Sequence, residues 1–277
     1  MDLTGKLDIA GKTDPGKLRD HNEDKIGEEV ELGAVVLADG MGGYRGGEVA
    51  SAIATNAVLN HLHEHLPKLR PGARDKHSGI GMEAIVARDA VLRANAEIVK
   101  ASDAQPQYRG MGTTIVLGVF YDNRIAVVHV GDSRMYRYRQ GKIETVTKDH
   151  TLLQELIDRG LYSEQEARES LNKNLVTRAL GVDADVTADV QELIVEPNDL
   201  YLLCSDGLND MIEDHEILAA IENQDPGLQN IADNLVERAL QAGGRDNVSV
   251  ILARLQAPFP APPMSWYEKI SDYFVNQ

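Results

Sequence analysis

Residues 35–47 read VVLADGMGGYRGG: four apolar residues lead to the carboxylate of Asp39, and glycine fills five of the next eight positions. The apolar run predicts a buried β-strand, because it is short, rich in branched residues and bounded by polar residues and glycine. Glycine lets a backbone carbonyl approach a ligand closely and leaves room for water beside it. The stretch therefore predicts a rigid, buried strand that places Asp39 at the start of a glycine-rich loop.

The same arrangement recurs along the chain, where an apolar run ends or begins at a carboxylate. The further carboxylates are Asp132 after 127–130, Asp206 after 200–204, Asp246 before 248–255, and the adjacent pair Glu23 and Asp24. A carboxylate at the edge of a core is costly to ionise unless a positive charge meets it, and basic residues are scarce in these stretches. An Asp-Gly pair taken alone is more often a turn than a ligand, so the inference depends on the number of coincidences.

If these strand ends converge, the partner most able to neutralise all of them is a metal ion. Oxygen ligands of this kind suit Mg²⁺ or Mn²⁺, and no spacing of Cys and His selects zinc. We therefore expect a hard divalent cation in a shared acidic pocket.

Strand patterns dominate the chain and often follow one another directly. The predicted strands are residues 7–10, 34–38, 113–121, 124–130, 135–138, 186–195, 200–204 and 247–255, and the predicted helices are residues 48–66, 80–101, 152–159 and 231–241. The short polar turn at 122–123 predicts an antiparallel hairpin. Strands that adjoin in runs indicate an α+β fold with layered, largely antiparallel sheets rather than a doubly wound parallel sheet.

The composition limits the classes of protein to consider. The chain has 277 residues and a formal net charge of −16, with 28 Lys and Arg against 44 Asp and Glu, which argues against non-specific binding of nucleic acid. Its one cysteine, Cys204, allows no disulfide framework and favours a reducing compartment. We find no signal-peptide pattern and no apolar run near the ~20 residues that a membrane span needs. We expect a cytoplasmic monomer without a membrane span.

Two segments depart from the strand pattern. The polar, helix-prone insertion at 151–178, which begins at Thr151 and ends at Arg178, has the size of a lid or recognition element. Residues 257–263 carry four prolines, which predicts a semi-rigid spacer, and an aromatic tail follows to residue 277. We expect this tail, which holds Trp266, to fold back on its own domain. A docking peptide for a partner is the alternative.

Eight motifs occur in order between residues 7 and 255. They are R19-x-x-x-E23-D24, L37-A-D-G-M-G-G43, G110-M-G-T-T114, V130-G-D-S-R134, K148-D-H150, T177-R-A-L-G181, C204-S-D-G-L208 and G244-R-D-N247. Together they resemble the bacterial branch of the PPM family, the metal-dependent (type 2C) serine/threonine protein phosphatases. The resemblance implies a central sandwich of two antiparallel β-sheets flanked by α-helices, in α-β-β-α layers, with a catalytic domain at 1–256.

The resemblance also assigns roles to residues of the acidic pocket. Asp39 would bridge two Mn²⁺ or Mg²⁺ ions, and the Gly40 carbonyl would complete the second site. Asp206 and Asp246 would hold the first ion, and Asp206 would share a weaker third site with Asp132.

Four residues around the ions also receive roles from the resemblance. Glu23, Asp24 and Asn247 would lie around the metal ligands and order water, and Arg19 would bind the phosphate. Residues 151–178 would form the flap. A methionine, Met41, stands where eukaryotic relatives place a histidine that protonates the leaving group, and His150 is a candidate replacement.

The implied activity is hydrolysis of phosphoserine and phosphothreonine in proteins, opposite a Ser/Thr kinase. A metal-activated bridging water would attack phosphorus, with no covalent enzyme intermediate. Two alternatives stay open: a catalytically silent regulatory module of the same fold, and a small-molecule phosphatase. The complete set of metal aspartates speaks against the silent module.

Overall fold

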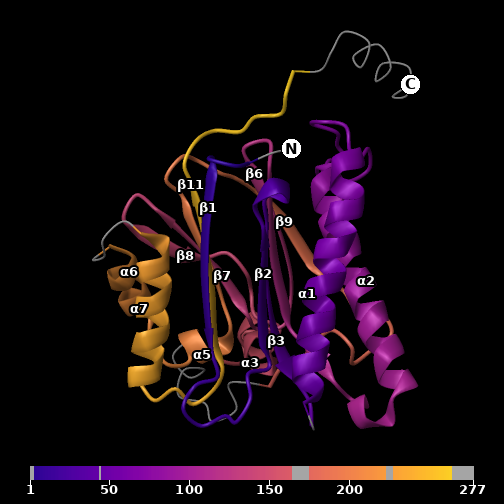
Figure 1. Ribbon diagram of the computed structural model, residues 1–277, viewed down its shortest axis with the longest axis vertical. Helices are drawn as coiled ribbons and strands as arrows, with labels where there is room; N and C mark the ends of the chain where they lie inside the picture. Colours follow the sequence, from indigo (N-terminus) through magenta and orange to yellow (C-terminus); the bar gives the residue numbers. More distant parts are fainter. Residues whose placement is uncertain (1–2, 44, 164–174, 223–226, 264–277) are drawn as a thin grey trace.

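Two antiparallel sheets pack face to face, and helices cover both outer faces (Figure 1). The computed structural model describes residues 3–43, 45–163, 175–222 and 227–263. The first sheet has the strand order β1-β11-β10-β7-β8 and the second has the order β2-β3-β5-β6-β9, with the short β4 paired to β3. The expected fold of two antiparallel sheets flanked by helices is confirmed.

The strands of the two sheets contain between two and eight residues. The first sheet comprises β1 (Leu7–Asp14), β11 (Val248–Leu255), β10 (Leu200–Cys204), β7 (Arg134–Arg139) and β8 (Lys142–Thr145). The second comprises β2 (Asp24–Glu29), β3 (Ala34–Met41), β5 (Ile115–Tyr121), β6 (Arg124–Val130) and β9 (Asp189–Ile194), beside β4 (Gly112–Thr113).

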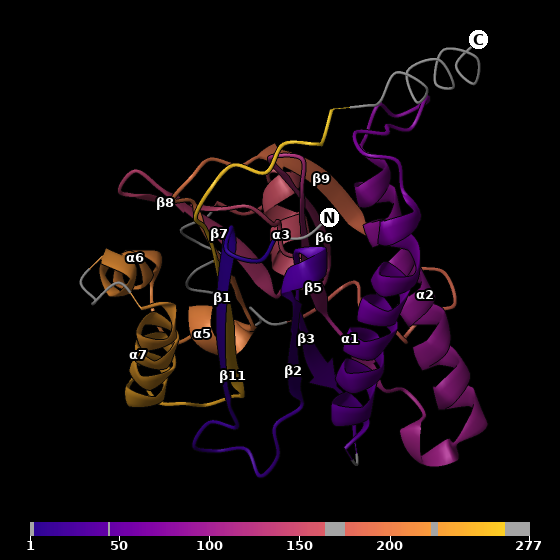
Figure 2. The same ribbon diagram turned by 45° about the horizontal axis from the view of Figure 1, so that its top comes forward.

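The helices form the two outer layers, as the turned view in Figure 2 shows. Helices α1 (Gly46–His65) and α2 (Met82–Ala104) pack on the second sheet, and α5 (Asp206–Asn209), α6 (Asp214–Glu222) and α7 (Leu228–Gln241) pack on the first. Helix α3 (Leu152–Asp158) belongs to the insertion, and short 3-10 turns occur at Val30–Leu32, Leu66–Lys68 and Pro106–Tyr108. Among the described residues, no helix combines the length and the apolarity needed to cross a bilayer.

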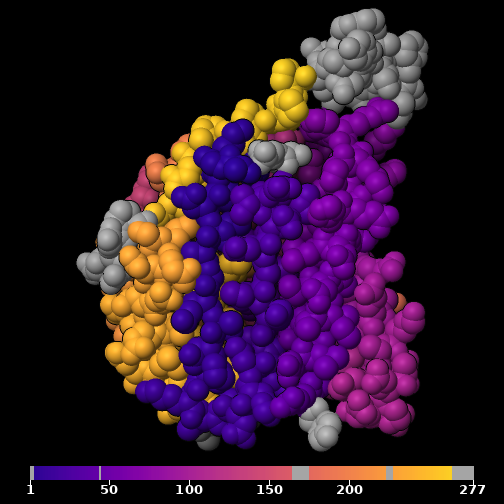
Figure 3. All heavy atoms as spheres, in the orientation of Figure 1, coloured from indigo at the N-terminus to yellow at the C-terminus, as the bar shows by residue number. Residues whose placement is uncertain are grey.

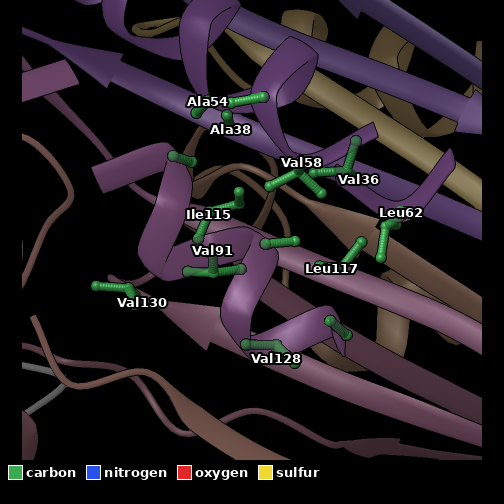
Figure 4. Packing of buried hydrophobic residues seen from close by; sticks show 14 of the residues in the cluster. Val36, Ala38, Ala54, Val58, Leu62, Val91, Ile115, Leu117, Val128 and Val130 are labelled. Atoms are coloured by element: carbon green, nitrogen blue, oxygen red, sulfur yellow. The ribbon is translucent and has the colours of Figure 1, made fainter. Parts of the chain in front are cut away.

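The opening run of apolar residues forms β3, a central strand that is buried on both faces. Val35 and Leu37 point into the core between the two sheets, and Val36 and Ala38 point into the core under α1 and α2 (Figure 4). Side chains of a strand alternate between its faces, so a strand covered on both sides reads as a continuous apolar run. This double burial makes β3 a rigid base for Asp39.

The sequence predicted the central strands well and missed elements at the edges. Each predicted strand overlaps an observed one, and the turn at Asp122 and Asn123 joins β5 to β6 as an antiparallel hairpin with both residues at positive φ. The unpredicted strands β2 and β8 lie at sheet edges and carry polar residues, which gives them no apolar pattern. Helices α5 and α6 were also missed.

The two ends of the insertion meet at its base. Thr151 forms an isolated antiparallel bridge with Val176, and Leu152 N–H donates to the carbonyl of Leu175 at 2.9 Å. The Thr151 hydroxyl accepts from Gln154 N–H and so caps the first turn of α3. Residues 164–174, which include the centre of the expected flap, lie outside the described residues.

The proline-rich segment contributes a side chain to the core. Phe259 is 2 % exposed and belongs to the buried cluster between the sheets that also contains Leu3 and Phe120. Its backbone N–H donates to Asn123 Oδ1 at 2.6 Å. The packed body therefore extends past the boundary at 256 that we expected, at least to Phe259. Trp266 and the rest of the tail from 264 onward lie outside the described residues.

We expect Phe259→Ala to lower the free energy of unfolding by about 3 kcal/mol, because it removes a buried aromatic ring from the core between the sheets. Ile194→Ala is the matched control, since Ile194 is 61 % exposed and should change stability by less than about 1 kcal/mol. Denaturant unfolding of both variants checks this. Equal losses in the two variants would contradict the anchoring role of Phe259.

Candidate metal centre

Five aspartates lie near one another at one end of the sandwich, because the charges of Asp24, Asp132, Asp206 and Asp246 all act on Asp39. The end of β3 and the helix α5 lie toward the lower end in Figure 1. Asp24 begins β2 and lies directly opposite Asp39 near the end of β3. The other three are Asp132 two residues after β6, Asp206 at the start of α5 directly beyond β10, and Asp246 two residues before β11. Because neighbouring strands run antiparallel, their alternate ends come to the same edge. The strand ends therefore converge as the sequence analysis required.

The close approach of α1 to the end of β3 explains why the loop after Asp39 is rich in glycine. A Cβ atom on Gly40 would lie 2.1 Å from the carbonyl oxygen of Gly47, and a Cβ on Gly47 would lie 2.6 Å from Glu23 Oε2. Gly40 N–H donates to the carbonyl of Glu23 at 3.1 Å. Only glycine lets the first turn of α1, the end of β3 and Glu23 come together.

Threonine side chains fix the backbone at Asp39. Asp39 N–H donates to Thr114 Oγ1 at 3.1 Å, and the Asp39 carbonyl accepts from Thr113 Oγ1 and from Thr114 N–H, each at 2.8 Å. Thr114 Oγ1 also lies 2.7 Å from Ser133 Oγ, beside Asp132. These hydroxyls link the Asp39 strand to the Asp132 turn and hold both carboxylates in register.

Asn247 organises the loop that carries Arg19 and Glu23. Its Oδ1 accepts from Glu23 N–H at 2.8 Å, and its Nδ2 donates to the carbonyls of Pro15 and His21, each at 2.9 Å. Asn247 is 5 % exposed, so these bonds are shielded from water. It acts on the backbone of this loop, and the β1–β2 loop is thereby pinned beside Asp246.

Asp24 is a buried carboxylate with one satisfied oxygen. Its Oδ2 accepts from Ser205 Oγ at 2.8 Å, whereas its Oδ1 has no hydrogen-bond partner among the described residues. Burial raises the pKa of Asp24 to about 6. A buried carboxylate oxygen left unpaired is an unfavourable arrangement that a cation or an ordered water would relieve.

The carboxylates destabilise one another in their charged forms. Burial, followed by repulsion from the neighbouring aspartates, raises the pKa of Asp39 and of Asp206 well above the usual range. Burial and the charge of Asp149 raise the pKa of Asp132 to about 6. Such a set of oxygen donors fits divalent cations, which would replace the missing positive charge.

Within the described residues, the five aspartates form one direct ion pair with a basic side chain, and it joins Arg19 to Asp246. Arg19 Nη2 lies 2.6 Å from Asp246 Oδ2, and the two side chains are 54 % and 37 % exposed. Asp246 also accepts from the N–H of Asn247 through Oδ1 at 2.8 Å. Arg19 is thus held beside the aspartates by Asp246, with more than half of its side chain exposed.

The aspartates are neighbours without forming a tight cluster. Within the described part of the chain, the one group of three Asp, Glu, His or Cys side chains whose ligand atoms lie within 4.8 Å of one another is His129, His150 and Asp189. The carboxylates repel one another in their charged forms, and Arg19 holds Asp246 in an ion pair at 2.6 Å. Binding of a shared ion requires its oxygens to draw together.

The histidine group is a structural tether that the sequence analysis did not identify. The rings of His129 and His150 stack 4.7 Å apart at 20°, so their in-plane lone pairs do not converge on one point. His150 Nδ1 accepts from Gly131 N–H at 3.1 Å, and the backbone of His150 bonds both Gly131 and Thr177. His150 therefore ties the Asp132 turn to the base of the insertion.

His150 does not fit the role of proton donor that the sequence suggested. It is 3 % exposed, its Nδ1 is an acceptor, and its Nε2 lies 3.5 Å from Asp189 Oδ2. Burial lowers the pKa of His150 to about 4, so the ring is neutral at pH 7. The motif K148-D-H150 is better explained by this packing than by proton transfer.

Comparison with known proteins gives consistent results. The family model described as Protein phosphatase 2C matches residues 19–244. The serine/threonine protein phosphatase PstP of Mycobacterium tuberculosis is 39 % identical over 253 residues, which cover 91 % of this chain and 45 % of PstP. The serine/threonine phosphatase Stp of Listeria monocytogenes is 33 % identical over 244 residues, which cover 87 % of this chain and 93 % of Stp. The chain thus spans less than half the length of PstP.

The similarity extends to a solved three-dimensional structure. The catalytic domain of PstP, crystallised with two manganese ions, superposes with a TM-score of 0.78 at 36 % identity. The match covers 91 % of this chain and 99 % of that one.

We expect Mn²⁺ to raise the melting temperature at pH 7.5, and to raise it less as the pH falls through about 6. Asp24 and Asp132 have folded pKa values of about 6 against an ordinary 3.8. Without metal, these groups contribute stability at low pH that is lost as the pH rises through about 6. Protons and cations compete for the same oxygens, so the gain from metal shrinks on acidification. Thermal melts in Mn²⁺ and in EDTA at each pH measure this gain in melting temperature.

The matched control is Asp39→Asn, which keeps the side-chain shape and removes a buried charge. In EDTA at pH 7.5 this variant should melt above the wild type, and Mn²⁺ should no longer stabilise it. Burial lowers the pKa values of His129 and His150, so these residues change the stability with pH in the opposite direction to Asp24 and Asp132. Their contribution is the same in Mn²⁺ and in EDTA, so it cancels when the two melting temperatures at one pH are subtracted. A metal-induced gain that survives Asp39→Asn would refute the assignment of the site.

Proposed function

The chain belongs to the protein phosphatase 2C family, and we propose that it hydrolyses phosphoserine and phosphothreonine in proteins in a reaction that depends on Mn²⁺ or Mg²⁺. The observation that supports this most strongly is the convergence of five aspartates, from strands far apart in the sequence, on one pocket with few positive charges. PstP and Stp, which are named as serine/threonine phosphatases, are 39 % and 33 % identical to this chain.

We propose which residues hold the ions. Asp39 would be shared by two ions, with the Gly40 carbonyl at one of them and Asp206 and Asp246 at the other. Asp132 and Asp206 would hold a third ion more weakly. Bound divalent ions supply two things to phosphate hydrolysis, namely charge neutralisation and a water that ionises near neutral pH.

Arg19 is proposed to orient the phosphate. Its exposed guanidinium donates one hydrogen bond, from Nη2, to Asp246. The other N–H donors of this planar group would bind phosphate oxygens. Asp246 holds the guanidinium in place, so the position of Arg19 is set before substrate arrives.

The remaining acids are proposed to order water around the ions. Glu23 lies against the first turn of α1, and burial raises its pKa above the usual range. Asp24 is fixed through Ser205, and its other oxygen has no hydrogen-bond partner among the described residues. Met41 has no acidic proton and His150 is buried and neutral, so we assign protonation of the leaving group to a water in the open site.

The biological setting is proposed from the same family membership. Phosphorylated proteins would be the substrates, a Ser/Thr kinase would oppose the reaction, and residues 151–178 would form a flap beside the pocket. The buried free thiol of Cys204 is compatible with a reducing cytoplasm. We propose that the protein acts there as a monomer.

The decisive test is hydrolysis of a phosphothreonine peptide with added Mn²⁺. We expect Asp39→Asn and Asp206→Asn to lower kcat/KM by about a thousandfold, because loss of the ions removes several kcal/mol of charge stabilisation. Glu64→Gln is the control, since Glu64 is an exposed carboxylate at the far end of α1 and should retain full activity. Phosphate release is measured directly.

Three outcomes would separate the alternatives. Full turnover in EDTA would reject the metal-dependent mechanism. Binding of Mn²⁺ with no turnover of any phosphate ester would identify a silent module. Turnover of free phosphoserine but of no phosphopeptide would identify a small-molecule phosphatase.

A further inference from the structure

Arg45 has an unusual backbone conformation for its residue type. Its φ is 62° and its ψ is 20°, in the left-handed region. Among the described residues, the other non-glycine residues with positive φ are Asp122, Asn123, Gln140 and Asn198, all of them polar residues in turns. Left-handed backbone is disfavoured for a residue with a long side chain, and such outliers concentrate at functional sites.

Glycine would be less strained at this position, and glycine occupies most of the surrounding loop. Arg45 nevertheless places an exposed guanidinium there, and that side chain makes no hydrogen bond or ion pair with any other residue that the structure describes. Within the described part of the chain, no side-chain contact of Arg45 therefore compensates for this conformation. A role toward a partner outside the chain would explain it.

Arg45 stands close to the proposed metal centre. It is two residues from Gly47, whose carbonyl packs on Gly40 and whose Cα lies against the carboxylate of Glu23. Two residues span at most about 7 Å, and an arginine side chain has a similar reach. A group bound in the pocket, or a chain passing over it, lies within the range of this guanidinium.

Two further cations lie on adjacent loops at the same end of the molecule. Lys17 N–H donates to the carbonyl of Gly244 at 2.7 Å, and Arg245 immediately precedes Asp246. Both side chains are exposed, and neither makes a hydrogen bond or ion pair with any other described residue. Figure 3 shows the β1–β2 loop, in indigo, beside the orange-to-yellow segment that leads into β11 at the lower end.

We propose that Lys17, Arg45 and Arg245 form a cationic rim that selects phosphoprotein substrates with acidic residues next to the phosphorylated residue. This inference rests on the proposed function and names its substrate class. Exposed acids also lie there: Asp20 beside Arg19, and Glu48 in the first turn of α1. Arg19 is already paired with Asp246, and the three cations of the rim outnumber these two acids.

The rim matters because the rest of the protein repels acidic peptides. The formal net charge is −16, so an acidic substrate gains attraction only where cations are local. Salt screens charges beyond about 8 Å at physiological ionic strength, which confines the attraction to residues flanking the phosphate. The rim would therefore discriminate by the immediate neighbours of the phosphorylated residue.

The test compares three phosphothreonine peptides of equal length, with Asp/Glu, Ser or Lys on both sides of the phosphothreonine, at saturating Mn²⁺. For the wild type at low salt, we expect kcat/KM for the acidic peptide to exceed that for the Lys peptide by about tenfold, and 0.5 M NaCl to reduce this preference. In the triple variant Lys17→Ser, Arg45→Gly, Arg245→Ser, the ratio should fall to about one or below.

Single variants keep the test independent of folding. Arg45→Gly relieves the left-handed backbone, so it should melt at or above the wild-type temperature while it lowers the acidic-to-Lys ratio at least about twofold. Gln140→Gly is the matched control, because it makes the same backbone relief in the β7–β8 turn and should leave the ratio unchanged.

The outcomes are distinct from those of the proposed function. If the wild type hydrolyses an aryl phosphate with Mn²⁺ but treats the three peptides alike, the rim is wrong and the phosphatase assignment stands. A preference that persists in Arg45→Gly and in the triple variant also overturns the rim. If the wild type hydrolyses neither aryl phosphate nor any peptide, the proposed function fails and the rim fails with it.

Discussion

Repulsion among buried carboxylates is the constraint on which the rest of the structure depends. Asp24, Asp39, Asp132 and Asp206 are each held with a raised pKa, which means that the fold keeps them where their charged forms are unfavourable. A marginally stable protein can carry such a cost only where the surrounding structure is rigid. The four-layer core supplies that rigidity, since β3, β6 and β10, which lead to Asp39, Asp132 and Asp206, are buried on both faces.

The same constraint explains the details around the pocket. Glycine is needed where α1 approaches Gly40, hydroxyl groups of Thr113 and Thr114 secure the Asp39 backbone, and Asn247 fixes the loop that carries Arg19. His150 connects the Asp132 turn to the base of the insertion, and so links the proposed flap to the proposed third ion site. Position and charge are thus set by the same few contacts.

The sequence predicted the fold where burial leaves a pattern and failed where it does not. Strands buried on both faces, such as β3, appear as apolar runs, whereas the polar edge strands β2 and β8 do not. The acidic pocket was found because several carboxylates share the same strand-end context. The tether formed by His150 and the core position of Phe259 could not be found, because each depends on contacts between residues far apart in the sequence. The proline run around Phe259 indicated a spacer.

The central claim is that the converging aspartates bind divalent ions that no side chain of the protein can replace. Its most direct test is a crystal structure with Mn²⁺, with the ions located by anomalous scattering. The account predicts two strong peaks bridged by Asp39, one of them also contacted by Asp206 and Asp246, with Asp246 drawn away from Arg19. Peaks found only elsewhere, such as beside His129 and His150, or no peak in the acidic pocket at saturating Mn²⁺, would contradict it.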